Sequence, residues 1–232
     1  MIVAGSVLLA AGCGGHGSAK AEKPTVKASS TTAAAAGGKP VAMTRAQLDH
    51  AVIADGDAAG WKVTAAKAAS GPVGGARMVA DKAACQPVAD ALSETGAVKS
   101  VAAVERSAVA EDRSGIMVRV RLASYDGDGA GKIMADLAGA AQKCKGFDGS
   151  GSGGKQHVGV AQYDAYLSAQ TSLGFRLTAK VGKQTLPIYL DVGSVGGTVE
   201  YLATFNVLGD DPGTGSTTAE RQQSVKLGAA TT

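Results

Sequence analysis

Alternating hydrophobic and polar residues predict a series of β-strands from residue 98 onward. Within 115–124 every second residue is aliphatic, while the positions between them include Arg119 and Arg121. This period of two is typical of a strand with one buried side. Similar segments occupy 60–63, 98–109, 156–163, 171–181, 186–193 and 197–207. Short turns between most of them favour an antiparallel hairpin at 98–124 and an antiparallel meander closer to the C-terminus.

Capping residues and hydrophobic spacing predict helices around these strands. Thr44 and Gln47 have the spacing of a capping box for a first helix, and Thr217 and Glu220 have it for a last one that ends near Leu227. Two more helices, near 84–92 and 130–144, each place a cysteine on their apolar side. The glycine- and serine-rich stretch 147–154 is expected to be a loop.

The order of these elements predicts an α+β fold, in which a twisted antiparallel sheet has helices packed on one face. We expect this domain to occupy residues 43–207. Residues 208–232 are expected to form a C-terminal tail that contains the last short helix.

Composition limits the class of protein. The chain has 232 residues, of which 45% are hydrophobic and 4% aromatic. This length allows one domain of ordinary size or two small ones, with a core of aliphatic side chains. No apolar stretch reaches the ~20 residues of a membrane-spanning helix, which excludes a multi-pass membrane protein. A coiled coil and a zinc-finger array are excluded as well.

The N-terminus has the pattern of an export signal. Residues 1–12 carry no charge and contain an apolar centre, and they lead through small residues into Cys13. Leu9-Ala10-Ala11-Gly12-Cys13 resembles the lipobox of bacterial lipoproteins. The resemblance implies cleavage before Cys13 and a lipid on its sulfur, and hence a membrane partner on the extracytoplasmic face of the cell membrane. The alternative is an apolar N-terminus on a cytosolic protein.

Residues 13–42 are expected to form a disordered tether. Gly, Ser, Thr, Ala, Lys and Pro dominate this segment, and such a composition cannot fill a core. The tether carries four lysines and one glutamate, whereas residues 43–232 contain equal numbers of acidic and basic side chains. A folded part that is neutral overall argues against a nucleic-acid partner.

The three cysteines suggest one disulfide. If Cys13 carries lipid, Cys85 and Cys144 remain as a pair in an exported protein. A bridge between them closes a loop of roughly 60 residues and is worth about 4 kcal/mol in the chain-entropy model. The alternative is two separate buried thiols that pack as small hydrophobic groups.

No residue pattern indicates catalysis, a metal site or a cofactor. Fragments that resemble a phosphate loop, a calcium loop and a Ser-x-x-Lys motif each lack required residues. The three histidines, His16, His50 and His157, have no suitable partners close in the sequence. Among the aromatic residues, Trp61, Tyr163 and Tyr166 are candidates for contacting a ligand, although packing in the core is the simpler explanation for them.

The chain is similar to small lipoproteins of high-GC actinobacteria. The stretches Leu122–Tyr125, Ala141–Phe147 and Val192-Gly193, together with Tyr201, resemble the extracellular sensor domain of PknH-type Ser/Thr kinases and its stand-alone lipoprotein relatives. The likeness covers about residues 43–207. It implies sensing or binding of an extracellular ligand or envelope protein, without enzymatic activity.

Three functional hypotheses follow. The first is a lipid-anchored extracytoplasmic lipoprotein that acts as a non-catalytic binding or sensor-like module. The second is an envelope carrier of a lipid or other apolar ligand, which requires a cavity lined by aliphatic side chains. The third is an envelope hydrolase, which requires that folding bring a nucleophile, a base and a carboxylate together.

Overall fold

The computed structural model describes residues 40–66, 77–93, 95–151, 154–165, 167–181, 184–213 and 217–231. The predicted signal peptide (1–12), Cys13, the tether as far as residue 39, and Tyr166 lie outside the described residues. Within the described ranges, no helix is both long enough and apolar enough to cross a membrane.

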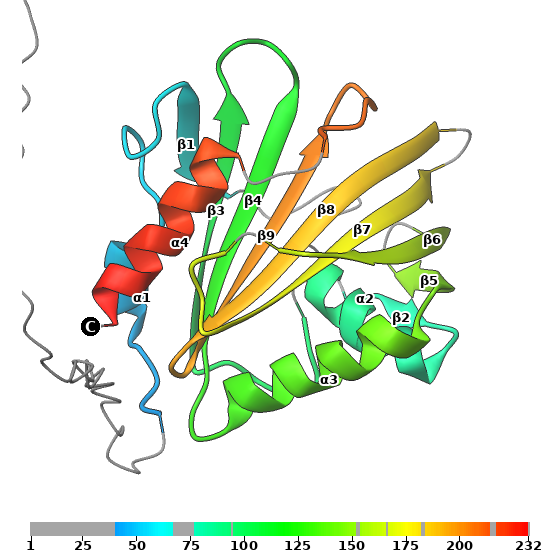
Figure 1. Cartoon of the computed structure of the whole chain (residues 1–232), viewed down its shortest axis with the longest axis horizontal. Helices are drawn as coiled ribbons and strands as arrows, with labels where there is room; N and C mark the ends of the chain where they lie inside the picture. The colour runs from blue at the N-terminus through cyan, green and yellow to red at the C-terminus, as the bar shows by residue number, and fades with distance from the viewer. Residues whose placement is uncertain are drawn as a thin grey trace, which may run out of the picture. The chain divides into compact units, whose positions relative to one another are not determined.

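The domain is built on one antiparallel sheet of nine strands, in the order β1-β3-β4-β9-β8-β7-β6-β5-β2 (Figure 1). Each strand pairs with its neighbours in antiparallel register. The strands are β1 (Trp61–Ala65), β2 (Val79–Ala80), β3 (Ala102–Ala110), β4 (Ile116–Ser124), β5 (Gly146–Gly151), β6 (Gly154–Tyr163), β7 (Thr171–Val181), β8 (Gln184–Val195) and β9 (Thr198–Asn206).

Four α-helices and one short 3₁₀-helix lie against the sheet. They are α1 (Arg45–Ala51), η1 (Ala83–Cys85), α2 (Gln86–Ser93), α3 (Gly129–Lys143) and α4 (Thr218–Ala230). Both predicted capping boxes are present, at Thr44 with Gln47 and at Thr217 with Glu220. Asp128 is the N-cap residue of α3, but its side chain makes no capping hydrogen bond.

The helices are divided between the two faces of the sheet, which corrects the expectation that they cover one face. On what we call the α2/α3 face, α2 and α3 pack with Phe175, Leu190 and Val192 in one hydrophobic cluster. On the opposite α1/α4 face, a second cluster joins α1 and α4 to Val118 and Val120. Figure 1 shows α1 and α4 beside β3 and β4, whereas α2 lies at the β5 and β2 end. Successive residues of a strand point to opposite faces of the sheet. Central strands with apolar residues at both odd and even positions therefore bury both of their sides.

The predicted hairpin and meander are confirmed. β3 pairs with β4, and β6, β7, β8 and β9 follow one another as antiparallel neighbours. The expected loop at 147–154 is wrong, because residues 146–151 form β5 and β6 starts at Gly154. Glycine and serine give this strand no hydrophobic alternation. Its backbone instead pairs with β6, and Phe147 on it is completely buried.

The last helix belongs to the folded domain. Ala219 and Leu227 on α4 are completely buried in the cluster of the α1/α4 face. The side chain of Gln223 accepts a hydrogen bond from the backbone N–H of Ile53 (2.7 Å) and donates one to the carbonyl of Ala51 (3.3 Å). The structure therefore extends the domain beyond residue 207 to include α4.

A disulfide joins the two helices of the α2/α3 face. Cys85 ends η1, directly before α2, and Cys144 is the C-cap of α3. Their Cα atoms are 5.0 Å apart and their sequence separation is 59. The bridge fixes the start of α2 against the end of α3, as the cysteine pairing predicted.

Candidate functional site

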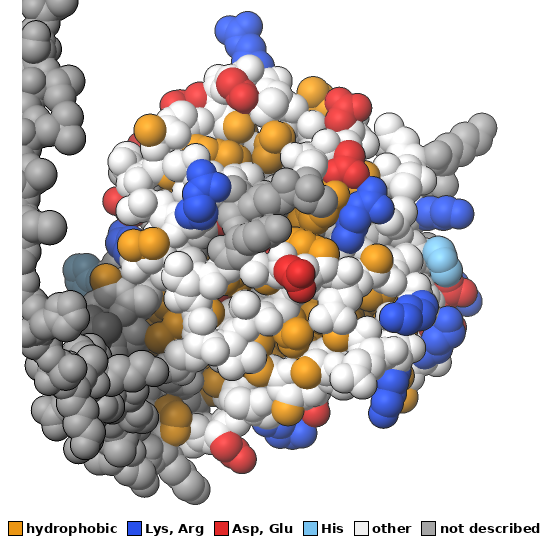
Figure 2. All heavy atoms as spheres, viewed as in Figure 1, with side chains coloured by type: hydrophobic (Ala, Val, Ile, Leu, Met, Phe, Trp, Pro, Cys, Tyr) orange, Lys and Arg blue, Asp and Glu red, His pale blue; other side chains and the backbone are white. Residues whose placement is uncertain are grey.

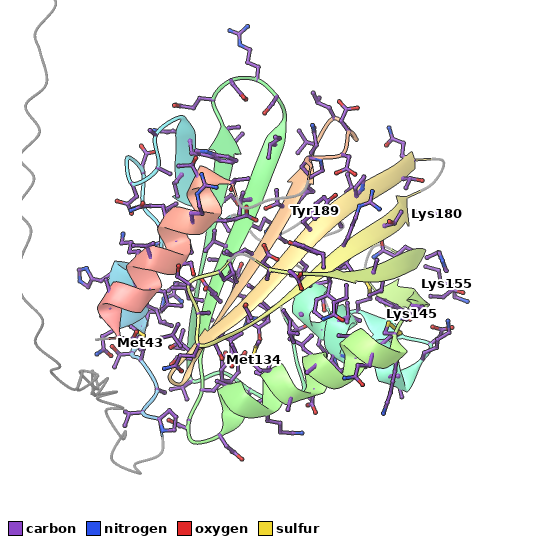
Figure 3. The ribbon with its side chains drawn as sticks, in the orientation of Figure 1. Met43, Met134, Lys145, Lys155, Lys180 and Tyr189 are labelled. Atoms are coloured by element: carbon purple, nitrogen blue, oxygen red, sulfur yellow. A yellow bond between two sulfur atoms is a disulfide. The ribbon has the colours of Figure 1, made fainter. Side chains whose placement is uncertain are left out.

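The α2/α3 face contains a cavity of about 210 Å³. Its walls come from η1 and α2, from α3, from the connection at residues 96–98, and from the sheet at β4 and β9. In Figure 3, Met134 marks α3, and Tyr189 marks β8 in the sheet that α3 covers. The disulfide joins η1 to α3, so a covalent link connects two of the cavity walls.

Arg121 is the most unusual residue of the cavity. It lies on β4, opposite Glu105 of β3 and Tyr201 of β9 in the strand register. Its side chain is only 12% exposed, and its Nε is buried without a hydrogen-bond partner among the described residues. The nearest carboxylate oxygen, Oε1 of Glu105, is 3.6 Å from that Nε, which is beyond hydrogen-bonding distance. Buried guanidinium groups normally have their N–H donors satisfied.

Two tyrosines lie beside this arginine. The guanidinium carbon of Arg121 is 5.6 Å from the centre of the Tyr201 ring, a cation–π distance. The hydroxyl oxygens of Tyr201 and Tyr125 are 3.2 Å apart. Burial, together with the neighbouring Tyr125, raises the pKa of Tyr201, so the Tyr201 hydroxyl keeps its proton. One hydroxyl donates to the other, which leaves one O–H without an acceptor among the described residues.

The acidic side chains of the cavity have partners. Asp90 accepts from the Arg77 guanidinium (3.0 Å) and from the Gln86 amide (2.7 Å). Asp136 forms an i,i+4 ion pair with Lys132 on the exposed side of α3. The remaining wall is mostly apolar and includes Ala83, Pro87, Ala91, Val98, Ile133 and Leu137. The polar groups that lack partners are therefore donors, and they lie near one end of an apolar wall.

The α1/α4 face carries a layer of three buried carboxyl groups instead. Asp191, Glu200 and Glu220 are each at most 2% exposed. Tyr163 donates a hydrogen bond to Asp191, and Ser224 donates one to Glu200 (3.0 Å). Glu220 accepts from the Thr204 hydroxyl and from the backbone N–H of Thr217, both at 2.5 Å. The layer joins β6, β8 and β9 to α4.

Burial raises the pKa values of these carboxyl groups. Desolvation brings the pKa of Asp191 to about 7 and that of Glu200 to about 7, and it also raises that of Glu220. Oε2 of Glu200 is buried with no hydrogen-bond partner among the described residues. Within those residues, no group of His, Cys, Asp and Glu side chains is arranged to hold a metal ion.

The structure does not place the predicted ligand-contacting aromatic residues in the cavity. Trp61 is half-buried on β1 and packs against the cluster of the α1/α4 face. Tyr163 contacts Tyr189 edge to face, with ring centroids 5.5 Å apart, and belongs to the carboxyl layer. Tyr166 lies outside the described residues. In the described structure, Trp61 and Tyr163 make packing contacts, and neither lines this cavity.

Sequence reasoning missed Arg121, Tyr125 and Tyr201 as a group. The alternation of β4 assigned Arg121 to a solvent-facing side, but α2 and α3 also cover this side in part. A signal was available, because long polar residues on a central strand are rarely left facing water when helices cover both faces of a sheet. The pairing of β4 with β9, which brings Arg121 and Tyr201 together, is not visible in the sequence.

Charged side chains elsewhere on the surface are solvated. Figure 2 shows acidic and basic groups on the same side of the molecule, with hydrophobic groups between them. Lys145, Lys155 and Lys180, labelled in Figure 3, are exposed near the β5 to β7 edge of the sheet. Their exposure to water makes these lysines a weaker candidate site than the cavity.

Comparison with known proteins identifies the fold. No protein-family model and no curated protein sequence matches the chain. The structure is similar to the crystal structure of the extracellular domain of PknH from Mycobacterium tuberculosis, with a TM-score of 0.54 and 8% identity, over 83% of this chain and 97% of that one. It also matches an uncharacterized protein from Mycobacterium smegmatis, the Rv0999 ortholog, with a TM-score of 0.39 and 16% identity, over 80% and 94% of the two chains. The expected resemblance to the PknH extracellular domain is therefore confirmed at the level of the fold.

Proposed function

We propose that this chain is an extracytoplasmic, non-catalytic binding or sensor-like module that holds a small ligand in the cavity between α2 and α3. The observation that carries the proposal is a largely enclosed arginine, Arg121, that lines a cavity and whose Nε–H donates no hydrogen bond to any described residue. Unpaired polar groups beside an apolar cavity are typical of a ligand site. The fold likeness to an extracellular domain supports the same assignment.

The composition of the cavity supports binding rather than catalysis. Its described lining contains no Ser, Cys or His. Asp90 and Asp136, the two carboxylates, are each paired with a cation. A hydrolase would need a nucleophile and a base within hydrogen-bonding distance of each other, so the envelope hydrolase is the weakest of the three hypotheses.

We further propose that a lipid on Cys13 holds the module at the outer face of the cell membrane. The lipobox-like sequence before Cys13 supports this anchor. A single acyl-type anchor next to a basic tether gives the two signals that stable membrane attachment requires. The disulfide between Cys85 and Cys144 also fits an oxidising compartment.

Intact mass spectrometry of the protein extracted from membranes tests this location. We expect a mature chain that begins at Cys13 and carries added acyl mass, and a gain of about two daltons on reduction from the disulfide. Cys13→Ser is the matched control and should release the protein from the membrane fraction. A cytosolic protein with residues 1–12 intact would refute the proposed location.

An envelope carrier of an apolar ligand is the second candidate, because aliphatic side chains form much of the cavity wall. A sensor and a carrier differ in how readily they exchange their ligand with a membrane. A carrier should transfer its ligand between two populations of vesicles at a rate that rises with protein concentration, whereas a sensor should retain it. Mass spectrometry of small molecules that co-purify with the protein identifies the compound to use.

A further inference from the structure

The cavity contains hydrogen-bond donors that lack acceptors. Arg121 has five N–H donors in a planar fork; its Nε is buried without a hydrogen-bond partner among the described residues, and Oε1 of Glu105 is 3.6 Å from it. The tyrosine pair next to it adds one free O–H. A group that satisfies these donors must therefore be an acceptor, and a charged acceptor gains most from a guanidinium that is 12% exposed.

The shape of the donors favours a planar acceptor. A guanidinium fork matches the two oxygens of a carboxylate and binds them through two parallel hydrogen bonds. The guanidinium carbon of Arg121 lies over the Tyr201 ring, 5.6 Å from its centre, so the fork and the ring are neighbours. In the Tyr125–Tyr201 pair one hydroxyl donates to the other, and the second O–H is available to an acceptor bound beside the pair.

The charges of the lining favour a single negative charge. Asp90 and Asp136 border the same cavity. They are paired with Arg77 and Lys132, but a ligand with two negative charges would still be repelled by both carboxylates. A carboxylate carries one charge, whereas a phosphate monoester carries close to two at neutral pH.

The remaining wall accepts an apolar body. Pro87 and Ala91 of α2 and Ile133 and Leu137 of α3 line it from two sides, and Val98 adds a third. The size of the cavity, about 210 Å³, suits a short chain or a single ring rather than a long lipid.

We propose that the ligand of this cavity is a small amphiphile with one carboxylate, which binds to Arg121 and the Tyr125–Tyr201 pair while its apolar part lies between α2 and α3. This inference rests on the proposed binding function and adds the chemical class of the ligand. The carboxylate replaces the hydrogen bonds that the protein itself does not supply.

Four probes with the same eight-carbon chain test the inference: octanoate, octanol, octylamine and octyl phosphate. The full chain with Cys13→Ser allows calorimetric titration without detergent, and the amide NMR signals of Ala91 and Val98 report on the cavity. We expect octanoate to bind about 10- to 100-fold more tightly than octanol, the gain typical of a charge-assisted hydrogen bond. Octyl phosphate and octylamine should bind more weakly than octanoate.

Arg121→Met should remove the advantage of octanoate over octanol, and Arg121→Lys should restore part of it. The matched control is Arg176→Met. Arg176 lies over the Tyr189 ring at 5.9 Å but on the α1/α4 face, so this variant should keep the full advantage. Thermal unfolding of each variant verifies that it is folded before titration.

The outcomes separate the two proposals. If octanol or octylamine shifts the cavity signals and octanoate has no advantage, the carboxylate inference is wrong while the binding function stands. An octanoate advantage that persists in Arg121→Met also refutes the inference. If none of the four probes shifts the signals of Ala91 and Val98, both the inference and the proposed binding cavity fail.

Discussion

The two faces of the sheet both place an arginine over a tyrosine ring, but they satisfy the guanidinium differently. On the α1/α4 face, Arg176 donates to the Tyr189 hydroxyl (3.0 Å) and to Asp211 (2.8 Å). On the α2/α3 face, Arg121 has only the Tyr201 ring and a carboxylate oxygen 3.6 Å away. The first arrangement is complete without a ligand, whereas the second lacks acceptors. An arginine over a tyrosine ring therefore does not by itself indicate a ligand site. What distinguishes the two arginines is whether their N–H donors have acceptors within the protein.

The faces also neutralise buried charge by different means. The α1/α4 face buries carboxyl groups whose pKa values are raised by burial, so protons neutralise them below about pH 7. The α2/α3 face buries a guanidinium that cannot lose its proton in a protein. The Glu105 carboxylate 3.6 Å away forms an ion pair with it, but the Nε–H still lacks a hydrogen bond among the described residues, and a bound anion would supply one. We therefore expect the two faces to respond differently to removal of the disulfide, to mutation, to pH and to ligand.

The largest effect is expected from removing the disulfide, which lies on the α2/α3 face alone. The double variant Cys85→Ser with Cys144→Ser should lower the free energy of unfolding by about 4 kcal/mol. The reason is that the unfolded chain regains the conformational entropy that the bridge removes by closing a loop of about 60 residues. Urea denaturation measures the loss. Hydrogen exchange should rise first in α2 and α3 and least in α4. Equal loss of protection in α4 would contradict the separation of the two faces.

Leucine truncation in the helices tests whether the faces have separate cores. Leu137→Ala on α3 and Leu227→Ala on α4 each remove a side chain at most 1% exposed. Each should cost about 2–5 kcal/mol in the free energy of unfolding, measured by chemical denaturation. Because the residues belong to different clusters, the double variant should show the sum of the two losses. A strongly non-additive result would mean that one core extends through the sheet.

The carboxyl layer should make stability depend on pH. The pKa values of Asp191 and Glu200 in the folded chain are about 7, compared with ordinary values of 3.8 and 4.5. Between about pH 4 and pH 7 the folded chain keeps protons that the unfolded chain has lost. The contribution of these two groups to the free energy of unfolding is therefore highest below this range, falls as the pH rises through it, and levels off above about 7.

Glu200→Gln isolates this contribution, since the amide cannot ionise. The variant should be about 2 kcal/mol more stable than the parent chain at pH 8 and nearly equal to it at pH 4. Glu111→Gln, at an exposed glutamate, is the matched control and should show no such difference. Denaturant titrations across this pH range provide the measurement, and parallel curves for Glu200→Gln and the parent chain would refute the assignment.

The smallest effect is expected at the two arginines. Arg121→Met should leave stability unchanged or raise it by about 1 kcal/mol, because it removes a buried charge that lacks hydrogen bonds. Arg176→Met should lower stability by less than about 1 kcal/mol, because it breaks exposed hydrogen bonds. Thermal unfolding of the two variants side by side gives the sign, and a clear loss for Arg121→Met would show that the protein itself satisfies this guanidinium.

Local patterns predicted most of the elements. The alternation at residues 116–124 and the capping boxes at Thr44 and Thr217 act over a few residues, so the sequence shows them directly. β5 was missed because no local pattern marks it. Its glycines and serines have no local preference for a strand, and it forms because β6 pairs along it from Gly146 to Gly151.

The cavity and the division of helices depend on long-range pairing. Arg121 and Tyr201 are 80 positions apart in the sequence and become neighbours only because β4 pairs with β9. Helices then pack on both faces of the central strands, and the alternation within one strand does not reveal this. Cys85 and Cys144 were predicted because their pairing follows from counting residues of one type, without knowledge of the sheet.

Both outer strands of the sheet are short, with five residues in β1 and two in β2. An exposed edge strand offers unpaired backbone N–H and C=O groups with which a strand of a neighbouring molecule can pair, and long edge strands promote aggregation. The brevity of β1 and β2 leaves little length for such addition. Many copies of the protein can thus be crowded together without joining into a continuous cross-β assembly.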